Sequence, residues 1–201
     1  MNQRLVWNFE FTTNGNASLT DFVDVKDEHL KWEIRYFWPE NKTIVLNNID
    51  MALLELGNYK HKIREDYYYL IAAQNYNIKK RRDQLLYKPL LKQTKQAVAY
   101  GPKIALGGHD NSGLPDLKEI REHVEKEGKE IYVKKEAFIY KLPTIPKAKI
   151  ELSRLEVHHK IYFSVCIEGK SLTLVKKISK LLLDEPVSCD YVTFLKNITK
   201  L

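Results

Sequence analysis

Strict alternation of apolar and polar residues is the feature that most constrains how this chain can fold. Alternate residues of a β-strand share one face, so such a run predicts a strand with one apolar and one polar side. Two segments show the pattern most clearly, residues 4–13 and 30–38. Their apolar positions are Leu5, Trp7, Phe9 and Phe11 in the first, and Leu30, Trp32, Ile34, Tyr36 and Trp38 in the second. The second segment carries Lys31, Glu33 and Arg35 on its other side, so one charged face is expected there.

Similar signals predict about eight strands in the whole chain. The other candidate segments are residues 43–46, 62–70, 77–81, 85–91, 129–142, 149–158 and 160–169. No regular alternation of strand and helix connects these segments. That organisation favours the α+β class, with an antiparallel sheet or barrel and helices packed outside it.

Two or three helices are expected, and four segments are candidates for them. Residues 50–56 and 115–127 are expected to form two of them, the second with Pro115 at its start. Ser171 is expected to cap a third helix and Asp190 a last one, over about residues 190–201. The position of this last helix relative to the sheet stays open.

The chain is basic, with a formal net charge of +7. Such a balance favours anionic partners, namely nucleic acid, nucleotides, polyphosphate or an anionic surface. Lysine, asparagine, isoleucine and tyrosine are all plentiful, so genome base composition is an alternative explanation of the charge. No RNP-like, KH-like or helix-turn-helix signature supports a nucleic-acid partner.

The sequence predicts a cytoplasmic protein with no membrane partner. No stretch approaches the ~20 apolar residues of a membrane span. The apolar run at residues 5–7 is too short for a signal peptide. Cys166 and Cys189 show neither CxxC nor zinc spacing, and reduced thiols are expected for both in that compartment.

Positive charge gathers on one face of a predicted strand, where Lys79 and Arg81 are alternate residues. Two adjacent cations on a sheet face repel each other unless solvent or an anion separates them. From this pattern alone, an anion site and a solvated face are equally open. The preceding strand places Arg64, Asp66 and Tyr68 on one face. That row indicates either a charged groove with internal counter-ions or a structural ion-pair network.

The acidic candidates come late in the chain. Glu168 shares a small, polar strand face with Ser164 and Cys166, which is typical of a solvent-filled interior. One strand earlier, Glu151 and Ser153 share a face. The opposite face of that strand is also polar, so which of the two points inward stays open.

The order of these short motifs resembles the CYTH, or triphosphate tunnel, superfamily, which includes thiamine triphosphatases and class IV adenylate cyclases. Residues 64–68 (REDYY) precede 77–82 (NIKKRR) and 85–88 (LLYK), and 163–169 (FSVCIEG) follows much later. Members of that family place a D-x-Y strand, an R-x-R-like hairpin, a strand ending in lysine and a pair of glutamate-bearing strands in this order. The resemblance covers roughly residues 32–183.

The resemblance implies a single domain over residues 1–201 that forms an eight-stranded antiparallel tunnel, with the C-terminal helix as a plug or an appendage. Inward lysine and arginine side chains would hold a triphosphate, polyphosphate or another phosphorylated ligand. The residues implied for this role are Lys79, Arg81, Lys88, Arg64, Tyr68, Arg35 and Lys135. The family also implies Mg²⁺ or Mn²⁺ held by carboxylates. The matching carboxylates are Glu33, Glu151 and Glu168.

One departure from the family pattern bears on catalysis. The acidic first strand of the family, ExExK, is matched at best by residues 33–37 (EIRYF), where Arg35 replaces the second acid and the lysine is absent. Arg35 would compete for the remaining carboxylate and disfavour a divalent ion. Three functions therefore stay open. They are a Mg²⁺- or Mn²⁺-dependent triphosphatase-like hydrolase, a non-catalytic binder of phosphorylated ligands, and a basic module that binds RNA or another protein.

Overall fold

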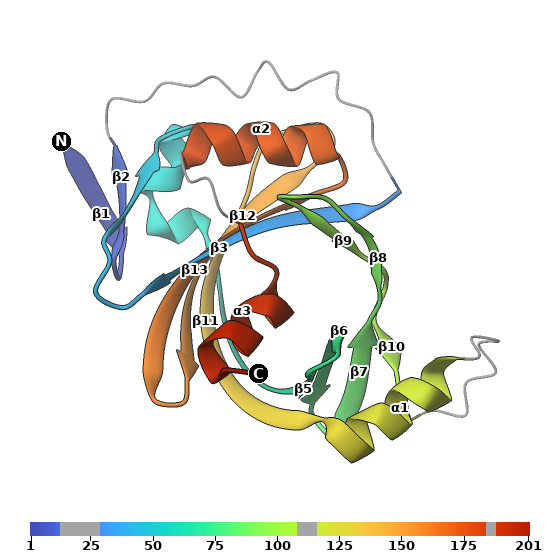
Figure 1. Ribbon diagram of the computed structural model, residues 1–201. Helices are drawn as coiled ribbons and strands as arrows, with labels where there is room; N and C mark the ends of the chain where they lie inside the picture. The colour runs from blue at the N-terminus through green and yellow to red at the C-terminus, as the bar shows by residue number, and fades with distance from the viewer. Residues whose placement is uncertain (13–28, 108–115, 184–187) are drawn as a thin grey trace.

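A curled antiparallel sheet forms most of the structure, a computed structural model that describes residues 1–12, 29–107, 116–183 and 188–201. Its strands are β3 (Lys31–Pro39), β5 (Lys60–Ile71), β6 (Gln74–Arg81), β7 (Gln84–Lys88), β8 (Leu90–Gln93), β9 (Val98–Tyr100), β10 (Ile104–Ala105), β11 (Lys129–Lys141), β12 (Ala148–Val157) and β13 (Lys160–Gly169). Their spatial order is β10-β7-β6-β5-β11-β12-β13-β3-β9-β8. Figure 1 shows this sheet curling around a central space.

The two ends of the curled sheet are joined because β7, next to one edge strand, continues almost directly into β8, the other edge strand. Only Pro89 separates β7 from β8, while β10 pairs with β7 and β9 pairs with β8. Proline has no N–H to give to a ladder, so it splits the strand expected over residues 85–91. Gly101 N donates to Pro89 O at 2.8 Å. A Cβ on Gly101 would lie 2.9 Å from Pro89 Cγ, so this close approach requires glycine. Within the described residues the curled sheet thus has ten strands and not the eight expected.

A separate three-stranded sheet lies beside the curled one. It contains β1 (Asn2–Val6), β2 (Phe9–Thr12) and β4 (Ile44–Asn47). The single strand predicted over residues 4–13 is wrong, because Trp7 has a φ of 48° and the chain turns back so that Val6 pairs with Phe9. Alternation continues through this tight turn, which is why the sequence pattern does not reveal the turn.

Capped helices follow the predicted positions at the C-terminal end. The α-helices are α1 (Asp116–Glu127), α2 (Leu172–Leu182) and α3 (Tyr191–Thr199). Ser171 Oγ accepts a hydrogen bond from Leu174 N at 3.2 Å, and Asp190 Oδ1 accepts from Val192 N and Thr193 N at 3.0 Å. Both predicted N-caps are therefore confirmed. In place of the helix predicted over residues 50–56 there are two 3₁₀ helices, η2 (Met51–Leu54) and η3 (Leu56–Asn58).

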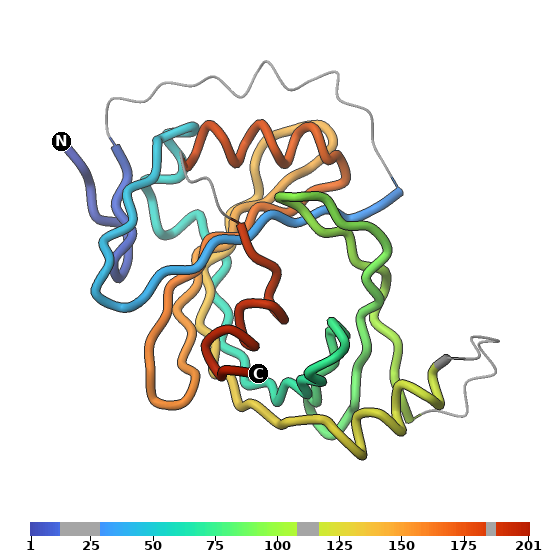
Figure 2. The backbone as a smooth tube through the Cα atoms, viewed as in Figure 1, coloured from blue at the N-terminus to red at the C-terminus, as the bar shows by residue number. Residues whose placement is uncertain are grey.

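The helices lie on both sides of the curled sheet. α2 packs on β13 and β3 from outside, and Tyr36 OH and Ser179 Oγ are 2.8 Å apart at this contact. α3 lies in the space that the sheet encloses, as Figure 2 shows from the path of the C-terminal segment. The expectation that helices pack outside is therefore correct for α1 and α2, and α3, whose position the sequence left open, lies inside the sheet. The reason is that α3 has apolar side chains that cover an apolar part of the inner face.

The inner face of the curled sheet is apolar at one end, and α3 covers that part of it. Phe194 stacks on Phe37 with ring centroids 3.8 Å apart. The buried Lys196 fixes the helix to the turn between β5 and β6, because its Nζ donates to Ala72 O at 3.0 Å, to Gln74 O at 2.8 Å and to Asn75 Oδ1 at 3.1 Å.

Among the residues that the structure describes, no helix combines the length and the apolar character needed to cross a membrane.

Candidate functional site

A basic cavity of about 520 Å³ lies on the inner face of the curled sheet. Nine lysine and arginine side chains but only three carboxylates line it among the described residues. The cations are Lys31, Arg35, Lys62, Arg64, Lys79, Lys88, Lys103, Lys135 and Lys149. The carboxylates are Glu33, Glu151 and Glu168. This imbalance makes the cavity a place where an anion would be stabilised.

Strand register explains why these residues meet. Glu168 lies opposite Glu33 in the β13–β3 ladder, and Cys166 lies opposite both Arg35 and Glu151. Residues directly opposite each other in a ladder share a face of the sheet. The face of β12 that carries Glu151 therefore points inward, which settles the alternative that the sequence left open.

Asp66 neutralises two of the predicted phosphate-binding residues. Its Oδ2 accepts from Lys79 Nζ at 3.0 Å, and its Oδ1 accepts from Arg81 Nε at 2.5 Å. Burial raises the pKa of the Asp66 carboxyl, but the hydrogen bonds from Arg81 and Lys79 outweigh this effect, so the pKa is lowered. Lys79 also lies 5.3 Å from the ring centre of Tyr68. This cluster is a satisfied ion-pair network at the wall of the cavity.

Glu151 forms a second internal ion-pair cluster. Its Oε1 accepts from Lys135 Nζ at 2.5 Å, from Arg35 Nη1 at 3.2 Å and from Ser153 Oγ at 3.3 Å. Burial raises the pKa of the Glu151 carboxyl, but Lys135 and Arg35 lower it by more, so the group stays ionised. One carboxylate is thus shared by two buried cations.

The other two glutamates of the cavity are also paired with lysines. Glu168 forms ion pairs with Lys31 and with Lys149, the second at 3.1 Å. Glu33 Oε2 lies 3.7 Å from Lys88 Nζ. Each of the three carboxylates in the cavity therefore has at least one cationic partner.

Three cations of the cavity have no carboxylate partner within the described part of the chain. They are Lys62, Arg64 and Lys103, for which the structure records neither an ion pair nor a side-chain hydrogen bond. The positive charge of Arg64 lowers the pKa of Lys62. Burial, followed by the charges of Lys79 and Arg81, lowers the pKa of Lys103. Mutual repulsion of this kind is relieved when an anion enters.

Tyr191, the first residue of α3, faces the same cavity. Its ring stacks on Tyr68 at a centroid distance of 5.0 Å, and Arg35 Cζ lies 5.3 Å from the ring centre. Burial raises the pKa of the Tyr191 hydroxyl well above its ordinary value, so the hydroxyl stays protonated. Neither this hydroxyl nor Arg35 Nε has a hydrogen-bond partner among the described residues. Two residues that line the cavity therefore each carry a buried donor without an acceptor in the described structure.

The carboxylates expected to hold Mg²⁺ or Mn²⁺ do not fit a divalent ion as they are arranged. Glu151 already accepts from Lys135 and Arg35, and Glu168 is paired with two lysines. Within the described ranges, no group of three or more histidine, cysteine, aspartate or glutamate residues is placed to hold a metal. A metal at Glu151 would have to displace both cations, and they would remain buried without a counter-charge.

The structure brings together nine of the ten residues predicted for the site. Lys79, Lys88, Arg64, Tyr68, Arg35, Lys135, Glu33, Glu151 and Glu168 all line the cavity. Arg81 does not line it, and belongs to a neighbouring depression that also contains Lys62, Arg64 and Arg82. Their roles toward a ligand or a metal stay predictions.

Several cavity residues were missed by the sequence reasoning. Lys31, Lys62 and Lys149 each lie two positions from a predicted residue, so period two along a strand could have found them. Tyr191 carries no such local signal, since its place depends on α3 lying inside the sheet.

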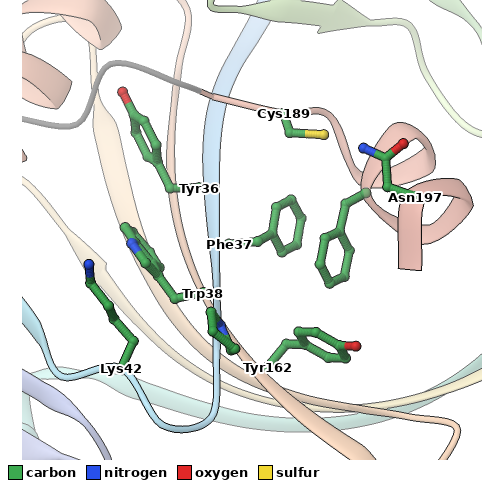
Figure 3. Close-up of a pocket in the computed structure, with 9 residues that line it drawn as sticks. Tyr36, Phe37, Trp38, Lys42, Tyr162, Cys189 and Asn197 are labelled. Atoms are coloured by element: carbon green, nitrogen blue, oxygen red, sulfur yellow. The ribbon is translucent and has the colours of Figure 1, made fainter.

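A second cavity of about 400 Å³ lies beyond α3, and Figure 3 shows that aromatic side chains dominate it. Its lining residues are Tyr36, Phe37, Trp38, Pro39, Lys42, Tyr162, Cys189, Phe194 and Asn197. Lys42 is the one charged side chain among these lining residues of the described chain. With one cation in its lining, this second cavity lacks the excess of positive charge that would favour a polyanion.

Comparisons with known proteins do not assign a family. No family model matches the chain, and no curated protein matches it. One solved structure that it resembles is described as a "putative adenylate cyclase" from Bacillus halodurans. The two are 8% identical, with a TM-score of 0.38, and the match covers 84% of this chain and 88% of that chain.

Proposed function

We propose that this chain binds a phosphorylated small molecule or inorganic polyphosphate in the basic cavity, as a CYTH-like tunnel that works without a divalent metal. The observation that carries the proposal is the excess of cations over carboxylates on the cavity wall. Lys62, Arg64 and Lys103 supply the unbalanced charge, because the other cations of the cavity contact carboxylates inside it or in its wall.

Phosphate suits this wall better than a single carboxylate does. Arginine binds phosphate oxygens through a planar fork, and lysine binds them as a point charge. Lys88 and Lys79 also lie over the rings of Tyr100 and Tyr68, at 4.5 Å and 5.3 Å from the ring centres. Such contacts hold the lysines in place before a ligand arrives.

A binding role without hydrolysis follows from the state of the carboxylates. Each glutamate in the cavity is paired with lysine or arginine, so none is available to coordinate a metal that would activate water. Charge neutralisation of the ligand would come from the fixed cations.

The test is a thermal shift with tripolyphosphate in the presence of EDTA. A ligand that binds only the native state raises the melting temperature. We expect a shift for the natural sequence and most of it lost in the double variant Lys62→Ala, Arg64→Ala. The matched control is Lys176→Ala, Lys180→Ala, which removes two exposed cations from α2 and should leave the shift unchanged.

Two results would overturn the proposal. One is the absence of any shift with tripolyphosphate, pyrophosphate or orthophosphate. The other is an unchanged shift in the Lys62→Ala, Arg64→Ala variant. Release of phosphate from tripolyphosphate with Mg²⁺ or Mn²⁺ would overturn the metal-free, non-catalytic part. Tight RNA binding with a steep salt dependence, and no polyphosphate binding, would favour the nucleic-acid alternative.

A further inference from the structure

We infer that Arg35 and Tyr191 form an inner anion subsite at the closed end of the cavity, and that this subsite takes the terminal group of a linear polyanion. The inference rests on the proposed function and narrows its ligand class. Arg35 comes from β3 and Tyr191 from α3, and both line the cavity. The C-terminal helix is then a part of the binding site as well as a plug.

Two donors without acceptors are the first observation behind this subsite. Arg35 is 8% exposed and Tyr191 is 5% exposed, and Arg35 Nε and Tyr191 OH both lack hydrogen-bond partners in the described structure. Buried polar groups of folded proteins are almost always hydrogen-bonded. Arg35 Nε can only donate and the Tyr191 hydroxyl can donate, and Arg35 Cζ lies 5.3 Å from the Tyr191 ring centre, so the oxygens of one anionic group are the partners that we propose for both.

The packing of α3 fixes Tyr191 where it is. Its ring stacks on Tyr68, while Phe194 one turn later stacks on Phe37. Asp190 caps the helix through two backbone N–H groups. A hydroxyl held by this many contacts is preorganised, so a ligand would lose little in ordering it.

The depth of the cavity argues for a linear ligand. Side-chain exposure falls from 57% at Lys31 and 31% at Lys149 to 12% at Lys135 and 8% at Arg35. Lys31 and Arg35 are four residues apart on β3, which corresponds to about 13 Å along a strand. A single phosphate cannot contact both the rim and the inner donors, whereas a chain of several phosphoryl groups can.

Tyr191→Phe is the sharpest test, because it removes the hydroxyl and keeps the ring that packs on Tyr68. We would measure dissociation constants for orthophosphate, pyrophosphate and tripolyphosphate by titration calorimetry in EDTA. We expect the affinity of the natural sequence to rise with chain length. Tyr191→Phe should lose roughly tenfold for tripolyphosphate, the effect of one hydrogen bond to a charged group. It should bind orthophosphate as the natural sequence does, because orthophosphate is held by the rim cations.

The matched control is Tyr132→Phe, which removes a hydroxyl from the outer face of β11 and should bind all three ligands unchanged. Equal tripolyphosphate affinity for Tyr191→Phe and the natural sequence would overturn the subsite while leaving the proposed function intact. Failure of the natural sequence to bind any of the three ligands would instead remove the proposed function. A melting temperature for each variant without ligand ensures that a loss of binding is not a loss of fold.

Discussion

Arg35 and Glu151 are 116 residues apart in the chain and face each other inside the curled sheet, with Arg35 Nη1 3.2 Å from Glu151 Oε1. The same oxygen accepts from Lys135 at 2.5 Å. Glu151 therefore neutralises Lys135 and pairs with one end of the Arg35 guanidinium, while Arg35 Nε stays without a partner in the described structure. The negative charge of Glu151 balances the buried positive charges of Arg35 and Lys135, which would otherwise destabilise the fold.

Replacing Glu151 by glutamine should lower the stability of the fold and raise its affinity for tripolyphosphate. The substitution keeps the shape of the side chain but leaves Lys135 and Arg35 buried without a counter-charge. We expect the free energy of unfolding to fall by about 3–5 kcal/mol, the range for breaking a buried ion pair. Tripolyphosphate should bind more tightly, because it would take the place of the Glu151 charge beside both cations.

Urea unfolding and titration calorimetry check these two effects. Glu156→Gln, on the outward face of the same strand, is the control and should change neither quantity by much. Weaker tripolyphosphate binding in Glu151→Gln would show that this carboxylate does not compete with the ligand.

Acid should weaken the fold through Asp66. Its folded-state pKa is lowered by hydrogen bonds from Arg81 and Lys79, which outweigh the effect of burial. A lowered folded pKa contributes stability that is fully present above the unfolded value of about 3.9 and is lost as pH falls through and below it. We expect the free energy of unfolding to drop between about pH 5 and pH 2 in the natural sequence.

Asp66→Asn should be less stable at pH 7 and show a flatter acid limb in urea unfolding at a series of pH values. Asp83→Asn is the control, because Asp83 is 98% exposed and lies 3.6 Å from Lys80. A natural sequence whose stability does not change between pH 5 and pH 2 would mean that the Asp66 cluster contributes little.

Period-two alternation predicted the inner and outer faces of β3 well, because a half-buried strand must segregate its side chains. Glu33 and Arg35 share a face in the sequence pattern and in the structure. The hairpin at Trp7 was invisible for a related reason, since an apolar residue at the turn continued the alternation. The inner position of Tyr191 could not be read from the chain, because it depends on which surface the apolar side of α3 covers.

The affinity for tripolyphosphate should fall as the pH is raised, and at a lower pH than ordinary lysines would cause. The charge of Arg64 lowers the pKa of Lys62, and burial with the nearby cations lowers the pKa of Lys103. A bound polyanion would raise both values. Affinity is then fully present below the lysine pKa values of the free protein and falls as pH rises above them. We therefore expect the affinity for tripolyphosphate to begin to fall, as pH rises, at a pH lower than the pKa of an ordinary lysine, which is about 10.4.

Calorimetry across about pH 7 to 10 at constant ionic strength measures this decline, and Lys62→Arg supplies the comparison. Arginine stays charged throughout this range, so the variant should keep more of its affinity at the alkaline end. Parallel pH profiles for the two proteins would place Lys62 outside the ligand's field.

The anchor of α3 at Lys196 offers a test of whether the plug supports the binding site. Lys196 Nζ donates to Ala72 O, Gln74 O and Asn75 Oδ1, so it fastens the helix to the β5–β6 turn. Lys196→Met keeps the length of the side chain and removes these hydrogen bonds. We expect a loss of about 1–3 kcal/mol in the free energy of unfolding, the cost of leaving buried acceptors without donors.

If α3 also positions Tyr191, tripolyphosphate affinity should fall with it, while orthophosphate affinity should not. Lys180→Met, in the last turn of the outer helix α2, is the matched control and should leave both affinities unchanged. A Lys196→Met protein that is destabilised but binds tripolyphosphate normally would separate the two roles, because the helix would then seal the sheet without shaping the site.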